Sequence, residues 1–149
     1  MDFTLPPEIE DVRLRTRRFV EEHVIAIEAD RDNYDGHENI RLDVLRELQA
    51  KARAEGLWAP QAPKEHGGMG LPMVGWAAMY EEANRSIFGP LAFNCAAPDD
   101  GNMNLLARHP GAAGEMAQAY RRGQGALLIC HDRACSRIGL RSRHDAYPR

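Results

Sequence analysis

Carboxylate pairs, histidines and cysteines are the residues of this sequence whose types could do chemistry. Glu81 and Glu82 are adjacent within residues 73–85, a stretch that reads as a helix. Neighbours on a helix point about 100° apart, so two such carboxylates cannot act on one atom as general acid and base. We therefore expect a solvated helix end here and no acid–base pair.

Metal-type residues gather near the end of the sequence, at Cys130, His131, Cys135 and His144. The C-x4-C spacing with an adjacent histidine fits zinc sites poorly, so we predict no metal. His23 has no second metal-type residue at helical spacing, and we expect a partly buried structural histidine. Neither the P-loop pattern nor a dinucleotide fingerprint occurs. We predict no catalytic, cofactor-binding or metal-ligating residue in this chain.

Composition describes an ordinary soluble chain. Of 149 residues, 44% are apolar and 28% charged, which suits one globular domain with a modest core. The net charge of −3 divides into −7 over residues 1–109 and +4 over residues 110–149. The short basic tail shows no base-stacking pattern, so we predict no nucleic-acid partner. Three cysteines without an apolar leader, an acidic start and no bilayer-length run predict a cytoplasmic protein that does not enter a membrane.

Residues 6–31 are predicted to form the first helix. Pro6 and Pro7 suit its first turn, where Glu8 and Glu10 lie near the positive end of the helix dipole. Its apolar stripe comprises Ile9, Val12, Thr16, Phe19, Val20, Val24 and Ile27. The residues expected to face water include Arg13, Arg17, Glu21 and Glu28. A polar loop around Gly36 follows in residues 31–40.

The central stretch, residues 45–71, reads as an amphipathic helix that runs into a rigid loop. Leu45, Leu48 and Ala52 follow helical spacing. Gly56 stands where a left-handed residue would end the helix. Prolines hold the following stretch extended, while Gly67, Gly68 and Gly70 permit backbone angles that other residues avoid. We expect this loop to have one defined path.

The remaining elements complete an all-α fold, a partial bundle of about four helices covering residues 3–109. Residues 73–85 carry small and apolar residues on most sides, which predicts a largely buried helix. Residues 86–100 begin with a break at Gly89 and Pro90 and end at Pro98, with Asp99 or Asp100 capping a short helix over residues 101–109.

The pattern L-x-x-L-x-x-x-A-x-x-x-G-L-W-x-x-x-x-P-K-E-H-G-G-x-G-L in residues 45–71 resembles the N-terminal helical domain of the acyl-CoA dehydrogenases. That family usually has tyrosine where His66 stands. The L-x-F-N-x-x-x-P-D-x-G-N-M-x-L-L-A-R-H pattern resembles a branch that handles long or branched acyl-CoA. By this resemblance, Asn94, Cys95 and Pro98 would form a wall at the inner end of the acyl-chain pocket, with plain core packing as the alternative.

The resemblance also implies a reaction and its partners. Full-length members are FAD-dependent oxidoreductases of fatty acid metabolism that desaturate acyl-CoA between the α and β carbons. A glutamate of the C-terminal helical domain removes the α proton, and the β hydrogen leaves as hydride to the flavin. Electrons pass to an electron-transfer flavoprotein, and the full-length enzymes are expected to form homo-oligomers.

The resemblance stops near His109. Reading codons compatible with residues 130–147 one base later recovers an M-T-E-P…G-S-D element, which resembles the flavin-facing start of the family's middle β domain. We therefore expect a domain over residues 1–109 and an aberrant, out-of-frame tail over residues 110–149. Such a chain would lack the middle and C-terminal domains and be inactive alone. The alternative function is a non-catalytic helical interaction module.

Overall fold

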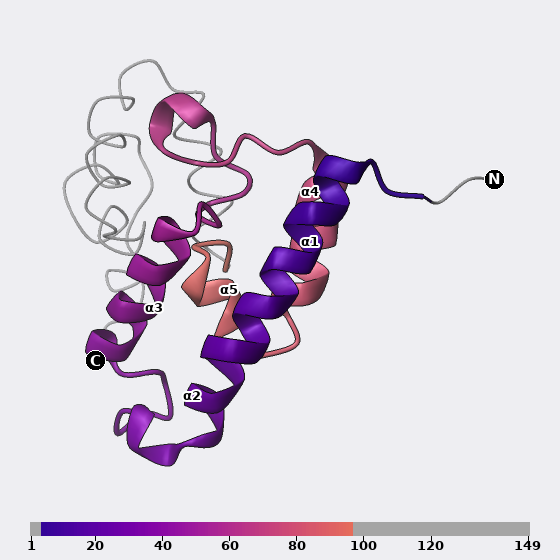
Figure 1. Cartoon of the computed structure of the whole chain (residues 1–149). Coiled ribbons are helices and arrows are strands. Elements are labelled where there is room, and N and C mark those ends of the chain that lie inside the picture. Colours follow the sequence, from indigo (N-terminus) through magenta and orange to yellow (C-terminus); the bar gives the residue numbers. More distant parts are fainter. Residues whose placement is uncertain (1–3, 97–149) are drawn as a thin grey trace, which may run out of the picture. The chain divides into compact units, whose positions relative to one another are not determined.

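The computed structural model of the protein describes residues 4–96, which form a bundle of helices (Figure 1). The elements, in order, are α1 (Pro7–Phe19), a π-helical turn (Val20–Val24), α2 (Ile25–Ala29), a 3-10 turn (Arg31–Asn33), α3 (Leu42–Ala54), a second 3-10 turn (Lys64–His66), α4 (Met73–Ala83) and α5 (Gly89–Ala92). Within this part of the chain, β pairing is limited to an isolated bridge between Tyr34 and Ile40. The predicted all-α class is confirmed, while the helix expected over residues 101–109 lies outside the described residues.

The first helix begins as predicted but is not regular throughout. Pro6 precedes its first turn, and Pro7 opens α1 with Glu8 and Glu10 in that turn. Further along, a π turn spans Val20–Val24, and the helix ends at Ala29, two residues before the predicted end. A π turn holds one more residue than an α turn, an irregularity that the apolar spacing did not indicate.

The predicted apolar stripe of this helix faces the core. Its buried members are Ile9, Val12, Thr16, Phe19, Val20 and Val24, and Ile27 is half-buried. Thr16 is the polar member, and its hydroxyl donates to the carbonyl of Val12 at 2.8 Å. This hydrogen bond satisfies the hydroxyl, so Thr16 can be fully buried among apolar residues.

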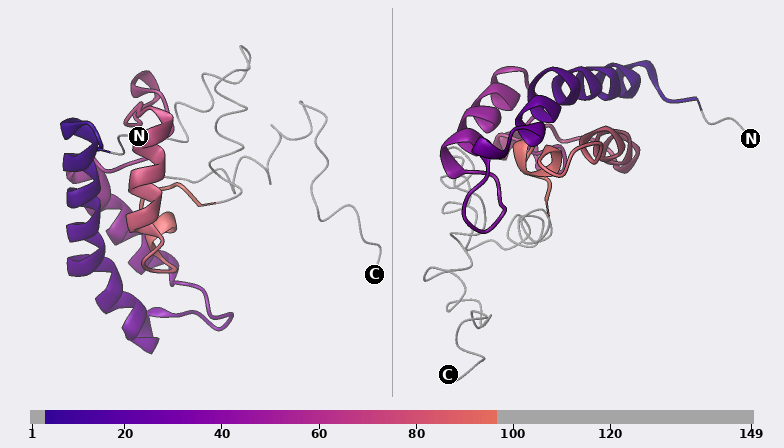
Figure 2. Two further views of the ribbon diagram at one scale, coloured as in Figure 1. Left: turned by 90° about the vertical axis from the view of Figure 1, so that its right-hand side faces the viewer. Right: turned by 90° about the horizontal axis from the view of Figure 1, so that it is seen from below.

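Helices α1 and α4 lie side by side and run in the same direction (Figure 2). Ile9 packs over Gly75 near the start of both helices, since a Cβ added at Gly75 would lie 3.1 Å from Ile9 Cδ1. Towards their ends, Glu21 binds Arg85 at 2.7 Å. The prediction that residues 73–85 are largely buried holds for one face only: Ala78 and Met79 are buried, whereas Met73 is 72% and Val74 43% exposed. This helix carries small and apolar residues on most of its sides, so the sequence did not indicate which side the rest of the protein covers.

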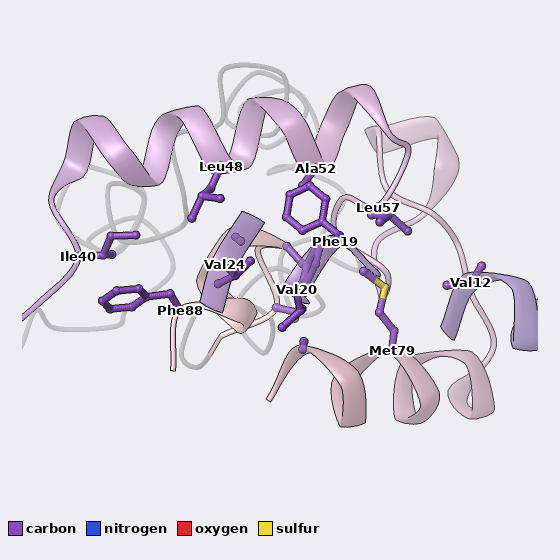
Figure 3. Close-up of a cluster of buried hydrophobic side chains, with 14 residues drawn as sticks. Val12, Phe19, Val20, Val24, Ile40, Leu48, Ala52, Leu57, Met79 and Phe88 are labelled. Carbon is purple, nitrogen blue, oxygen red and sulfur yellow. The ribbon is translucent and has the colours of Figure 1, made fainter. Parts of the chain in front are cut away.

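Helix α3 covers the other side of the core. It begins at Leu42, three residues before the predicted start, and buries Leu48 and Ala52. Figure 3 shows these two side chains pointing towards Phe19 and Val24, while Met79 of α4 enters from the opposite side. The core is therefore built between α3, the π turn and α4.

The chain reverses between α4 and α5 at a glycine. Gly89 and Pro90 were expected to break the structure, but they form the first turn of α5. Proline is tolerated there because the first-turn N–H groups have no intrahelical acceptor. Gly89 allows the close approach, since a Cβ at this position would lie 2.0 Å from the carbonyl oxygen of Ala83. The turn carries Phe93 into the core, where it is completely buried.

Candidate functional site

The loop after α3 is a closed structure held by its own backbone. Gly56 ends α3 with φ of +68°, as predicted. Two arms of the loop then pair: the N–H of Met69 donates to Ala59, that of Gly70 to Ala62 and that of Leu71 to Pro60, at 2.8 to 3.2 Å. The arms close the loop and define one path for it, as the prolines and glycines indicated.

Asn94 and Cys95 lie against this loop. The N–H of Ala59 donates to the carbonyl of Phe93 at 2.8 Å, and Nε2 of Gln61 donates to the carbonyl of Asn94 at 3.2 Å. Asn94 has φ of +56°, and its side chain and that of Cys95 are buried, at 5% and 6% exposure. Two of the three predicted pocket residues, which are neighbours in the sequence, therefore lie in a buried segment beside the loop. Pro98 lies outside the described residues, so the acyl-pocket wall stays a prediction.

Three polar side chains close to this loop have buried atoms without a hydrogen-bond partner within residues 4–96. They are Arg53 at Nε and Nη2, Trp58 at Nε1 and Gln61 at Oε1. Arg53 lies over the Trp58 ring, with Cζ 3.7 Å from the ring centroid. Burial lowers the pKa of Arg53. None of these residues was predicted from the sequence as part of a site. For Arg53 the reason is that an arginine next to alanines on an amphipathic helix is typical of a solvated face.

A buried carboxylate joins α1 to α4. Glu82 is 2% exposed, and it accepts from Arg13 Nη1 at 2.6 Å and from Arg17 Nε and Nη2 at 2.9 and 2.7 Å. Hydrogen bonds from Arg17 and then Arg13 hold the pKa of Glu82 below its ordinary value of 4.5, against the opposing effect of burial. The prediction that Glu82 lies at a solvated helix end was wrong. The two arginines were predicted to face water, and their side chains are 20% (Arg13) and 43% (Arg17) exposed, although both guanidinium groups bind Glu82. Their long side chains reach from α1 to α4.

Replacing Glu82 with glutamine is expected to lower the free energy of unfolding by about 2 kcal/mol, because two guanidinium groups lose their anion while keeping partial access to water. Because the folded-state pKa is lowered, the stability from Glu82 is present above about pH 4.5 and is lost as the pH falls through the folded-state pKa. Urea unfolding from about pH 7 down to about pH 3 measures both effects. Glu81→Gln is the matched control, since Glu81 is exposed. Equal stability of the two variants would show that the Glu82 cluster contributes nothing.

The other residues weighed for acid–base or metal chemistry form no site in the described part of the chain. Glu81 is exposed while Glu82 is buried, so the two carboxylates point apart as predicted. His23 is half-buried, edge-on to Phe19 and 3.8 Å from Glu55. Residues 4–96 contain no group of three potential metal ligands, and Cys130, His131, Cys135 and His144 lie outside them. None of the helices in residues 4–96 is long and apolar enough to cross a membrane.

Comparison with known protein families identifies a match over most of the chain. The sequence model described as "Acyl-CoA dehydrogenase, N-terminal domain" matches residues 6–110. "Probable acyl-CoA dehydrogenase FadE2" of Mycobacterium tuberculosis is 36% identical over 111 residues, which is 71% of this chain and 26% of that protein. Acyl-CoA dehydrogenase family member 11 of Rattus norvegicus is 34% identical over 103 residues, 65% of this chain and 13% of that protein.

A solved structure has the same fold. The chain of a Mycobacterium abscessus protein described as an acyl-CoA dehydrogenase aligns with a TM-score of 0.66 and 30% identity. The alignment covers 81% of the present chain and 33% of the solved one. The present chain therefore spans about a third of this solved relative and about a quarter of FadE2.

Proposed function

Because the chain belongs to the acyl-CoA dehydrogenase family through its N-terminal domain, we propose that it derives from an FAD-dependent enzyme that desaturates acyl-CoA thioesters between the α and β carbons. The observation that carries the proposal is the match over residues 6–110, with the same helical fold in a solved relative. The full-length enzyme would act in fatty acid metabolism in the cytoplasm, form a homo-oligomer and pass electrons to an electron-transfer flavoprotein.

Within that enzyme, the helical domain would supply one wall of the acyl-chain pocket. Asn94 and Cys95, with Pro98, are the residues we propose for this wall. Their support is a pair of hydrogen bonds that fix this segment against the loop. The backbone N–H of Ala59 donates to the carbonyl of Phe93, and the side-chain Nε2 of Gln61 donates to the carbonyl of Asn94. Enclosure of an acyl chain needs further walls, because a small-molecule site buries most of its ligand.

We assign no flavin-binding or catalytic residue to this chain. The flavin ring needs an extended set of contacts that place it against the substrate. Within residues 4–96, the buried side-chain polar atoms without a partner belong to Arg53, Trp58 and Gln61, and we assign none of them to the flavin. The base that takes the α proton would come from another domain.

The purified chain is expected neither to retain FAD nor to oxidise acyl-CoA, because one domain supplies only part of the required enclosure. Flavin absorbance of the purified protein tests the first expectation. Acyl-CoA-dependent reduction of an artificial electron acceptor, with FAD added, tests the second. Bound flavin together with turnover would contradict the expectation that the chain is inactive alone and would place a complete site in it.

Residues 110–149 are proposed to be read out of frame, forming a tail to a domain over residues 1–109. The family match ends at residue 110, close to His109, where the sequence pattern changes. Nucleotide sequencing decides the question: a frame shifted by one base should continue into the M-T-E-P element and a β domain. A shifted frame interrupted by stop codons would contradict the proposal.

A non-catalytic helical interaction module is the second candidate function. Exposed apolar side chains favour it, among them Met73 on α4, Leu42 on α3 and Ile87 before α5, all at least 60% exposed. Surfaces of this kind promote association. Concentration-dependent oligomerisation without ligand would support this alternative, whereas binding of FAD or acyl-CoA by the isolated chain would support the enzymatic role.

A further inference from the structure

Arg53 lies near the end of α3. One edge of its guanidinium group, formed by Nε and Nη2, has no hydrogen-bond acceptor among the described residues. The group lies over the Trp58 ring at 3.7 Å, an arrangement that restricts its orientation. Its Nε and Nη2 are shielded from water and have no partner in the described residues. The lowered pKa of Arg53 has burial as its cause, as expected for a cation without a compensating charge.

The same pair of nitrogens binds a carboxylate at two other arginines of this domain. Arg13 donates from Nε and Nη2 to the two carboxylate oxygens of Glu10, at 2.8 and 2.6 Å. Arg17 donates from Nε and Nη2 to the two oxygens of Glu82, at 2.9 and 2.7 Å. Both pairs are bidentate, a geometry in which two parallel N–H groups match the two oxygens of one carboxylate.

We propose that the Nε and Nη2 edge of Arg53, beside the indole ring of Trp58, is a binding site for a carboxylate. Trp58 is 5% exposed, and its Nε1 is a buried donor without a partner in residues 4–96. A carboxylate would satisfy the two Arg53 donors and the positive charge together. Leaving such groups buried and unpaired is costly, whereas charge-assisted hydrogen bonds are among the strong ones.

The carboxylate would reach Arg53 from the outer surface of α3. Ala50 and Ala54 on the same helix are exposed, and Arg53 itself is half-buried. Because Nε and Nη2 of Arg53 are shielded from water, binding requires the side chains that cover these two atoms to move aside. The carboxylate can come from a small free acid or from an acidic side chain of another polypeptide, and both present the same two oxygens.

Side-chain NMR of the isotope-labelled full chain tests the site directly. Acetate replaces chloride at constant ionic strength, and the Arg53 Nε–H and Trp58 Nε1–H resonances are expected to shift together and saturate. Arg46, exposed on the same helix, is the internal reference and should show no saturable shift. The peptide acetyl-Gly-Glu-Gly-amide, with its Gln counterpart as control, tests the polypeptide source. Saturation by acetate alone would identify a small acid as the ligand. Saturation by both acetate and the Glu peptide would show that the Arg53 edge also accepts acidic side chains of a polypeptide.

Two outcomes would overturn the carboxylate site. One is an equal, unsaturable response of Arg53 and Arg46 to acetate, and the other is saturation by inorganic phosphate without saturation by acetate. Arg53→Met supplies a separate readout, because a structural arginine would lower the melting temperature when removed. We expect the melting temperature of this variant to be unchanged or higher and the acetate response of Trp58 to disappear. A lower melting temperature with the Trp58 response intact would show that Arg53 only stabilises the fold.

Discussion

Replacing Gly89 with alanine is expected to lower the free energy of unfolding by about 3 kcal/mol or more, the largest loss among the substitutions considered. A Cβ at this position would lie 2.0 Å from the carbonyl oxygen of Ala83 and 2.9 Å from its carbonyl carbon. Both are backbone atoms at the end of α4, so no side-chain rotation relieves the overlap. The turn must open, which withdraws α5 and Phe93 from the core.

Urea unfolding followed by far-UV circular dichroism measures this loss. Gly36→Ala is the matched control, because a Cβ at Gly36 meets nothing within 4 Å and its backbone is not left-handed. The control should be neutral or slightly more stable, since alanine reduces the freedom of the unfolded chain. If Gly89→Ala were as stable as Gly36→Ala, the close packing of Ala83 on Gly89 would be wrong.

Patterns that repeat along one element predicted much of the fold. The stripe from Ile9 to Val24 indicated which face of the first helix is buried, because helical spacing alone relates those residues. The left-handed glycine at Gly56 was likewise predicted from the end of the apolar pattern. Such features depend on residues that are close together in the chain, so they can be predicted from the sequence without the rest of the structure.

Contacts between distant elements could not be predicted in this way. Glu82 was expected in water because it follows Glu81 near a helix end, yet α1 brings Arg13 and Arg17 to it from 69 and 65 positions away. Without that pairing, burial of the charge would be too costly to expect. The sequence could not show which charges meet, because the parallel approach of α1 and α4 decides it.

The residues of the candidate site also differ in whether the sequence could predict them. Asn94 and Cys95 were proposed from a family resemblance, and the structure adds the loop that supports them. Arg53 has no sequence signal as a buried cation, because its neighbours Ala50 and Ala54 are exposed and mark a solvent-facing part of the helix. Its position over Trp58 depends on the turn at Gly56, which folds the chain back beside the end of α3.

Replacing Gly68 with alanine is expected to destabilise the loop strongly, by about 2 to 3 kcal/mol. The sequence indicated that Gly67, Gly68 and Gly70 permit backbone angles that other residues avoid. Gly67 has φ of +86° with open space around it, whereas Gly68 is not left-handed but lies where the two arms of the loop meet. A Cβ there would be 2.3 Å from the carbonyl oxygen of Ala62 and 2.7 Å from that of Ala59.

Substituting these two neighbouring glycines therefore distinguishes the free-energy cost of a steric overlap from that of a strained backbone conformation. Gly67→Ala should cost about 1 kcal/mol, the penalty for a β carbon in a left-handed conformation, with the loop otherwise intact. Gly68→Ala should force the arms apart and break the hydrogen bonds from Met69 to Ala59 and from Gly70 to Ala62. Hydrogen exchange at Met69 and Gly70 measures this opening, with thermal unfolding giving the overall loss. Faster exchange in Gly67→Ala than in Gly68→Ala would contradict the packing of the loop arms on Gly68.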